Sequence, residues 1–166
     1  IEAALLRYER PLLRYATNFV GVHMSAEMVQ ETFLRLCKQD IKAVEGHLAA
    51  WLFTVCKNLC RDWARRKKAI TADTETVHNN APNPSESFEH KEAVDQANHW
   101  ISKLPEQQKH VIALKFHAEL SYKEIAEVMQ ISSSHVGVLL HKAIKNLRQS
   151  IFQKQTPVVP GASNDN

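Results

Sequence analysis

The segment SYKEIAEVMQISSSHVGVLL, residues 121–140, decides how the second half of this 166-residue chain folds. Ser121, followed three residues later by Glu124, predicts a capping box at the start of a short helix. The small side chain of Ala126 allows a second helix to cross closely, with a shared core from Ile125, Met129, Ile131, Val136 and Leu140. This spacing predicts a helix-turn-helix, whose second helix presents its outer face to the major groove of DNA.

The outer face of that second helix carries the residues we expect to contact DNA. His135, Val138 and Lys142 fall on one stripe. Ser133 and Ser134 stand at the helix start, where backbone amides bind phosphate. The alternative interpretation is an ordinary helical hairpin that is packed only for stability.

Three residues limit the strength of this DNA contact. Gln130 occupies the turn position where glycine is usual, so some strain is expected if the backbone there is left-handed. Gly137 and Leu139 occupy helix positions where a stronger DNA reader would carry Lys or Arg. Fewer cations release fewer counterions, so we expect this module alone to bind DNA weakly.

Composition and the positions of Gly and Pro predict an all-α chain of two small helical domains joined by a flexible linker. Glycine occurs only 4 times, and long stretches without Gly or Pro are rich in good helix formers. The first domain is expected at residues 1–68 and the second at 88–154. Residues 69–87 are rich in Thr, Asn, Pro and Ser and form the expected linker, and residues 155–166 form an expected disordered tail.

Three helical units are expected in the first domain. A short helix precedes Pro11, which suits the first turn of a new helix. The next unit starts at Ser25 as an N-cap. The last unit runs from Gly46 to Lys67 and is expected to bury Leu48, Leu52, Val55, Leu59 and Trp63. In the second domain, Pro105 is expected to start a helix.

A polar stripe lies opposite the predicted core of that last unit. Asn58, Arg61, Asp62 and Arg65 are spaced at i, i+3, i+4 and i+7, which places them on one helix face. Amides and carboxylates read base edges and arginines hold phosphates, so the stripe suits nucleic acid. The net charge of +3 permits such a polyanionic partner, although basic runs of this kind also occur as solvated helix ends.

The cysteines and histidines favour neither a metal site nor an enzyme. Cys56 and Cys60 are one helical turn apart and could hold zinc with His47, but a second close ligand pair is missing, so core packing is preferred. The 9 histidines are scattered without triad or metal-ligand spacing, so we expect no catalysis, no metal and no cofactor. Reduced cysteines, no membrane-length apolar stretch and no signal-peptide pattern predict a cytoplasmic protein without membrane insertion.

Four motifs, taken in order, resemble one family. They are AEMVQETFLRL at 26–36, AWLFTVCKNLCRDWARRK at 50–67, LPEQQ at 104–108 and LSYKEIAEVM at 120–129. Together they resemble the sigma-70 family of RNA polymerase sigma factors in its smallest form, the extracytoplasmic-function (ECF) subfamily. The resemblance covers residues 1 to about 152 and implies a promoter-specific transcription-initiation factor.

The resemblance implies two protein partners and two promoter elements. The first domain binds the polymerase clamp on the beta-prime subunit and reads and opens the minus-ten element, and the second reads the minus-thirty-five element and touches the beta flap. It assigns core-polymerase binding to Glu27, Gln30, Glu31 and Arg35. It assigns minus-ten binding to the polar stripe with Arg66 and to a loop at residues 40–47. Trp51 and Phe53 are expected to assist strand opening, with core packing as an equal alternative for Trp51. An anti-sigma factor is a further partner that the family implies.

This chain departs from the family pattern just before Val29. Met24-Ser25-Ala26-Glu27 stands where the family carries Asp-Ala-Glu-Asp, so one acid replaces three. One hypothesis is that polymerase docking is weakened and that phosphate added to Ser25 restores charge. The preferred alternative is that neighbouring contacts compensate. The rival to the sigma-factor interpretation is a stand-alone regulator that binds an operator and uses its first domain to dimerise.

Overall fold

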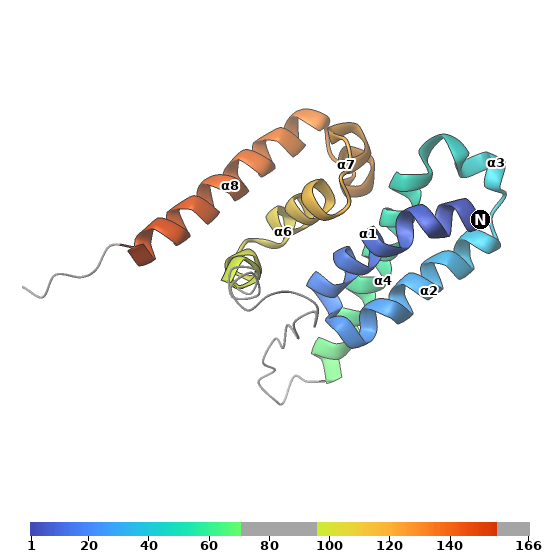
Figure 1. Cartoon of the computed structure of the whole chain (residues 1–166), viewed down its shortest axis with the longest axis horizontal. Coiled ribbons are helices and arrows are strands. Elements are labelled where there is room, and N and C mark those ends of the chain that lie inside the picture. Colours follow the sequence, from blue (N-terminus) through green and yellow to red (C-terminus); the bar gives the residue numbers. More distant parts are fainter. Residues whose placement is uncertain (71–95, 156–166) are drawn as a thin grey trace, which may run out of the picture.

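The computed structural model describes residues 1–70 and 96–155, with side chains as far as Phe152, and all regular elements in these ranges are helical (Figure 1). The first domain contains α1 (Glu2–Val20), α2 (Val22–Cys37), α3 (Ile41–Val44), the short 3-10 helix η1 (Glu45–His47) and α4 (Leu48–Ile70). The second contains a helical stretch at 96–102, α6 (Glu106–Ile112), the π-helical turn η2 (Ala113–His117), α7 (Tyr122–Met129) and α8 (Ser133–Gln155). The expected all-α, two-domain fold is confirmed.

The linker and the tail fall largely outside the described residues. Of the linker expected at 69–87, only Ala69 and Ile70 are described, and they continue α4. The start of the second domain at 88–95 also lies outside the described ranges. Of the expected tail, only Gln155 is described, as the last residue of α8.

The first domain is built on α1, which is a single helix and not the two that Pro11 suggested. Pro11 lies inside α1, where it removes one backbone hydrogen bond at a cost of about 3 kcal/mol. Ala4 and Leu12, on either side of it, are both buried in the core that α1 shares with α2 and α4. The packing of both halves of the helix on one core outweighs the local preference of proline to begin a helix.

The turn between α1 and α2 is made by Gly21 and not by a cap at Ser25. Gly21 has φ 80°, a value that a residue with a side chain rarely adopts, and α2 starts directly after it at Val22. Ser25 is therefore inside the first turn, 3% exposed, and its hydroxyl donates to the carbonyl of Val22 at 2.8 Å. The predicted N-cap was wrong, and a buried hydroxyl is a poor acceptor for the phosphate that we hypothesised there.

The buried face of α4 is rotated from the predicted one. Leu52 and Leu59 are buried as expected, whereas Leu48, Val55 and Trp63 are only half-buried. The deepest positions also include Phe53, which was expected to assist strand opening, and Cys56 and Cys60, for which core packing was the preferred interpretation. The cause is that α4 packs against α1 and α2 and also against α7 of the second domain.

The helix-turn-helix of the second domain forms as predicted. Ser121 and Glu124 make both bonds of the capping box: the Ser121 amide donates to the Glu124 carboxylate at 2.7 Å, and the Glu124 amide donates to the Ser121 hydroxyl at 3.3 Å. Gln130 has φ 56° and ψ 44°, so the left-handed backbone suspected at this turn is present. The crossing of α7 and α8 buries Ile125, Val136 and Leu140, and half-buries Met129 and Ile131.

Candidate nucleic-acid interface

The start of α8 gathers the residues expected to meet the minus-thirty-five element. Ser133, Ser134 and His135 form its first turn and are exposed. The hydroxyl of Ser132, just before the helix, accepts the amide of His135 at 3.1 Å. The side chain of Val138 is 47% exposed on the next turn, and Lys142 follows it in solvent. The predicted stripe is thus continuous and faces outward, and its five residues are all exposed.

Two positions that the sequence placed at the DNA side of α8 point elsewhere. Leu139 is only 7% exposed and belongs to the core, so the expectation that it replaces a DNA-reading cation was wrong. Gly137 is half-buried, and a Cβ added there would meet the ring of Tyr122 on α7 at 3.7 Å. Leu139 and Gly137 face the core or α7 because the helices cross at this point. The outer stripe carries little positive charge because Ser and Val residues occupy most of its positions.

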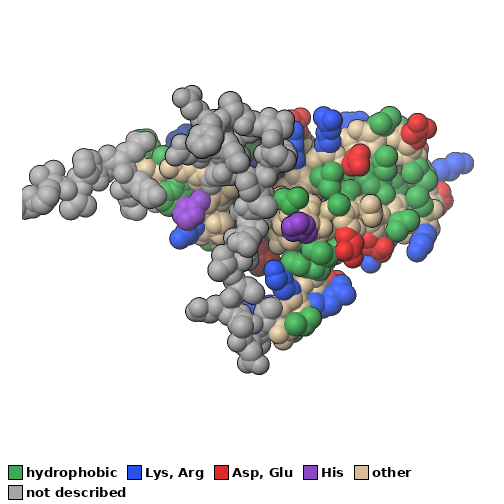
Figure 2. Space-filling view, turned by 60° about the horizontal axis from the view of Figure 1, so that its bottom comes forward, with side chains coloured by type: hydrophobic (Ala, Val, Ile, Leu, Met, Phe, Trp, Pro, Cys, Tyr) green, Lys and Arg blue, Asp and Glu red, His purple; other side chains and the backbone are tan. Residues whose placement is uncertain are grey.

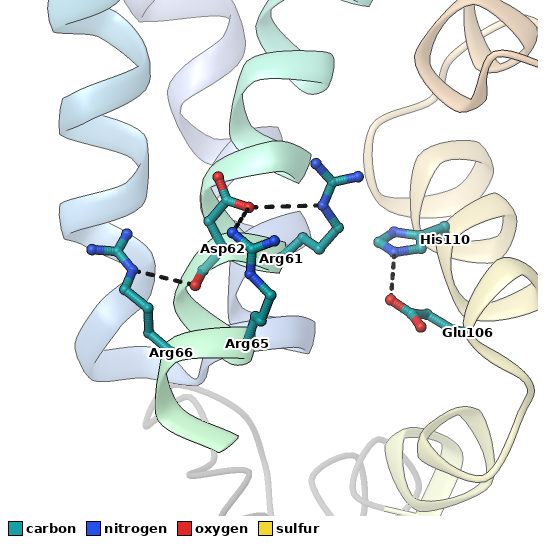
Figure 3. Close-up of polar contacts among 6 residues, drawn as sticks. All are labelled: Arg61, Asp62, Arg65, Arg66, Glu106 and His110. Atoms are coloured by element: carbon teal, nitrogen blue, oxygen red, sulfur yellow. Dashed lines mark hydrogen bonds and ion pairs between the residues drawn. The ribbon is translucent and has the colours of Figure 1, made fainter. Parts of the chain in front are cut away.

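On α4 the polar stripe forms a cluster of arginines around one carboxylate (Figure 3). Asp62 lies 3.6 Å from Arg65 and 3.9 Å from Arg61, and the Nε of Arg66 donates to the backbone carbonyl of Asp62 at 3.3 Å. The Arg61 and Arg65 side chains are 61% and 80% exposed, respectively. We call Arg61, Asp62, Arg65 and Arg66 the arginine cluster. Asn58 is half-buried one turn before it.

The electrostatics of the arginine cluster suit the binding of an anion. The cluster contains three arginines and one acid, so it carries a net charge of about +2; Arg61 and Arg65 lie near the Asp62 carboxylate, and Arg66 is bonded to the backbone carbonyl of that residue. Exposed ion pairs of this kind contribute between about 0 and 1 kcal/mol, so the guanidinium groups exchange a carboxylate for a phosphate at little cost. Asp62 therefore holds the arginines in position without neutralising them.

The residues expected to assist strand opening have different surroundings from those predicted. Phe53 is fully buried, and its ring meets that of Tyr15 edge-on at 5.6 Å, so its assignment to strand opening was wrong. Trp51 is half-buried against the core. Residues 40–47 are not a loop but α3 and η1, with the Asp40 carboxylate accepting the Lys42 amide at 3.1 Å.

The outer face of α2 carries the residues expected to bind the polymerase. Glu27, Gln30 and Arg35 are exposed, Glu31 is half-exposed, and the Arg35 Nε lies 2.8 Å from the Glu31 carboxylate. Leu34 sits beside this pair in the sequence and is 55% exposed. In Figure 2 acidic and basic side chains border a hydrophobic area on the first domain. A mixed apolar and charged face of this kind is typical of protein interfaces.

The structure also brings together residues that the sequence did not connect. The Lys57 ammonium on α4 donates to the carbonyl of Val128 on α7, and Tyr15 on α1 pairs with His110 on α6 at 2.8 Å. Burial, followed by nearby Lys57, lowers the pKa of His110 to about 4. The partners in these two pairs are separated by 71 and 95 residues in the sequence, and a local sequence pattern does not predict contacts at such separations.

Cys56 and Cys60 pack in the core as free thiols, which confirms the preferred interpretation. Their mutual hydrogen bond, together with burial, raises the pKa of the Cys60 thiol. Within residues 1–70 and 96–155, no three His, Cys, Asp or Glu side chains come together as a metal site. Among the helices described there, none is both long and apolar enough to cross a bilayer.

Comparisons with known proteins place both domains in one family. The family described as Sigma-70 region 2 matches residues 5–70, and the family described as Sigma-70, region 4 matches residues 100–149. The ECF RNA polymerase sigma factor SigL of Mycobacterium tuberculosis is 30% identical over 162 residues, which cover 90% of each chain. The ECF RNA polymerase sigma factor SigM of Bacillus subtilis is 28% identical over 131 residues, covering 76% of this chain and 78% of that protein.

A solved structure has the same fold. The sigma factor RpoE of Bartonella quintana, in complex with the anti-sigma factor NepR, superposes with a TM-score of 0.69. The match covers 91% of this chain and 95% of the other at 18% sequence identity. At that identity the likeness concerns the arrangement of the helices alone. Because the match covers most of both chains, the likeness extends across both domains.

Proposed function

Since the chain belongs to the ECF sigma factors of the sigma-70 family and directs promoter-specific transcription initiation, we propose that it does so through three separate exposed surfaces. The α2 face docks on the beta-prime subunit of core RNA polymerase through Glu27, Gln30, Glu31 and Arg35. The arginine cluster and Asn58 bind and open the minus-ten element. The start of α8 reads the minus-thirty-five element through Ser133, Ser134, His135, Val138 and Lys142. It acts in the cytoplasm without catalysis.

The observation that carries this proposal is the arginine cluster. Arg61 and Arg65 extend into solvent on the side of α4 away from the buried Leu52 and Leu59, and Asp62 orients them (Figure 3). Capture of unstacked bases and backbone beside such cations offsets the few kcal/mol that unstacking costs per step. Strand opening at the minus-ten element therefore needs no ATP.

Docking on polymerase supplies the affinity that the α8 stripe lacks. That stripe has a single lysine among its five residues, so few phosphates are neutralised when it binds DNA alone. The polymerase holds both domains near the promoter, and the effective concentration of each then replaces intrinsic affinity. An anti-sigma factor that covers these surfaces would oppose both steps.

Transcription in vitro with core polymerase tests the proposal. We expect Arg61→Ala with Arg65→Ala to weaken open-complex formation and to lower the salt dependence of promoter binding by about 2 in logarithmic slope, about 1 for each lost phosphate contact. Arg10→Ala, an exposed arginine on α1, is the matched control and should leave both unchanged. Equal open-complex formation by the double variant would contradict the proposal. Tight duplex binding without polymerase would instead favour an operator-binding regulator.

A further inference from the structure

Within residues 1–70 and 96–152, three polar contacts join the two domains, in addition to the packing of α7 on α4 and of η2 on α1. The Tyr15 hydroxyl pairs with Nδ1 of His110 at 2.8 Å, and the Asn18 amide pairs with Nδ1 of His117 at 2.9 Å. The Lys57 ammonium donates to the carbonyl of Val128 near the C-terminal end of α7. We call these three pairs the interdomain contact. In Figure 1, α7 lies beside α4, as the packing of these two helices requires.

Aromatic stacking reinforces the first of these pairs. The Phe19 ring stacks on the His110 ring with centroids 4.2 Å apart and planes inclined by 14°. Tyr15 and His110 are both buried, so their hydrogen bond is shielded from water. The second domain is thus seated on α1 through a buried polar pair and an apolar ring.

The interdomain contact occupies a cation beside the proposed minus-ten surface. Lys57 is one helical turn before Arg61 on α4, which places both on one side of that helix. Its ammonium is engaged by a carbonyl at the negative end of α7, a favourable position for a cation. While the domains touch, Lys57 is withdrawn from any nucleic acid that reaches Arg61.

The same contact also limits how far apart the two DNA surfaces can lie. Elements about 25 base pairs apart are separated by about 85 Å of B-DNA, at 3.4 Å per pair. The 23-residue helix α8, which carries the second surface, is only about 35 Å long. A second domain seated on α1 and α4 keeps its surface beside these helices, so we expect that it does not read the distant element while the first domain reads the near one.

We propose that the interdomain contact is an autoinhibitory latch that keeps the free chain closed, and that protonation of His110 and His117 opens it. This inference rests on the proposed function, since closure inhibits only if both surfaces must bind one promoter. The closed state is a property of the chain alone and is measured without polymerase or DNA.

The hydrogen bonds of Asn18 require His117 to be neutral. The Asn18 amide nitrogen also donates to the carbonyl of Arg14 at 2.7 Å, which identifies it as the nitrogen and not the oxygen. Its second hydrogen therefore points at Nδ1 of His117, which must accept with a lone pair. A proton on that nitrogen removes the acceptor and breaks the contact. Burial lowers the pKa of His117, and the charge of Arg14 lowers it further, so both oppose this protonation in the closed chain.

His110 sits among groups that oppose its protonation. The positive charges of Lys57 and Arg61 on α4, and of Lys109 on its own helix, disfavour a second cation at His110. The Glu106 carboxylate is 3.8 Å from Nε2 but is 77% exposed, so it offsets little of this positive field. From α1 it meets the neutral hydroxyl of Tyr15, whose pKa is raised by burial. Figure 3 shows Arg61 directed toward the side of α4 where His110 lies.

The direction of the pH effect follows from these surroundings. In the closed chain the pKa of His110 is lowered to about 4, whereas a histidine released to solvent titrates near 6.5. The closed state is therefore fully favoured above about pH 6.5 and loses stability as pH falls from there towards 4. Between pH 7.5 and 5.5 the closing equilibrium should weaken about tenfold through His110 alone. His117 adds to this effect.

Distances between the domains test the latch directly. Spin labels on the exposed native Cys37 and on Gln149→Cys in α8 report domain separation in the full chain. We expect one short, narrow distance at pH 7.5 and a growing long-distance population at pH 5.5. Phe19→Ala, which removes the stacked ring, should raise the open population at pH 7.5 and bring the equilibrium into the measurable range. Retained helical content by circular dichroism shows that this variant is folded.

Variants of the histidines separate titration from general acid sensitivity. The double variant His110→Gln, His117→Gln in the Phe19→Ala background should lose the response to pH, because neither amide titrates. His23→Gln, at an exposed position on α2, should keep it. The latch is overturned if the distances do not respond to pH in either the parent or the Phe19→Ala chain, or if the double variant responds as its parent does.

Transcription distinguishes failure of the latch from failure of the proposed function. At pH 7.5 and limiting protein, Phe19→Ala should reach half-maximal transcription at a lower concentration than the parent chain. If the variant is open but gains nothing, closure is not inhibitory and the sigma-factor proposal stands. If the parent chain supports no transcription with core polymerase, the proposed function fails, while the distance measurement still reports whether the chain closes.

Discussion

In the first domain the arginine cluster lies on α4, a 23-residue helix whose opposite side is buried among α1 and α2, whereas the second domain displays its stripe from α8 beside the 8-residue helix α7. The position of the first surface depends on a deep core. That of the second depends on backbone devices, namely the capping box at Ser121 and the left-handed Gln130. The two surfaces should therefore respond to different kinds of substitution.

The largest effect is expected from the buried side of the helix that carries the arginine cluster. Phe53→Ala removes a fully buried ring that contacts Tyr15, and should lower the free energy of unfolding by about 3–5 kcal/mol. Urea unfolding followed by tryptophan fluorescence measures this loss. Leu6→Ala, whose side chain is 78% exposed, is the control and should change stability by less than about 0.5 kcal/mol. Equal effects of both substitutions would remove the distinction between core and surface in this domain.

A smaller effect of opposite sign is expected at the turn of the second domain. Gln130 adopts φ 56°, which glycine adopts without the strain caused by a Cβ. Gln130→Gly should therefore raise the melting temperature, with a gain of about 0.5–1 kcal/mol after the greater entropy of the unfolded chain is subtracted. The same substitution at Gln149, inside α8, should destabilise by a similar amount because glycine is a poor helix former. A loss at both positions would show that the turn is not strained.

The features that sequence predicted correctly are those set by neighbouring residues. Ser121 and Glu124 are three residues apart, so their capping box is visible as a pattern, and the turn at Gln130 follows from the helices on either side. Prediction failed where distant packing decides. Pro11 stays inside α1 because both halves of the helix share one core, and Leu139 turns inward because α7 crosses α8.

The candidate surfaces were predictable to different degrees. The arginine cluster follows from helical spacing alone, because Arg61, Asp62 and Arg65 fall on one face whatever the helix packs against. The partners of His110 do not, since Tyr15 is 95 residues away and Lys57 belongs to another helix. Histidines that looked scattered along the chain are brought to one interface by the meeting of the two domains.

The central claim is that two separate surfaces of one chain bind one promoter together. Photo-crosslinking groups placed at Arg65 and at Lys142, in the full chain bound to core polymerase and promoter DNA, test it most directly. The account predicts crosslinks from both positions on the same DNA molecule, about 25 base pairs or 85 Å apart. Crosslinks from only one position, or from both within a single element, would contradict it.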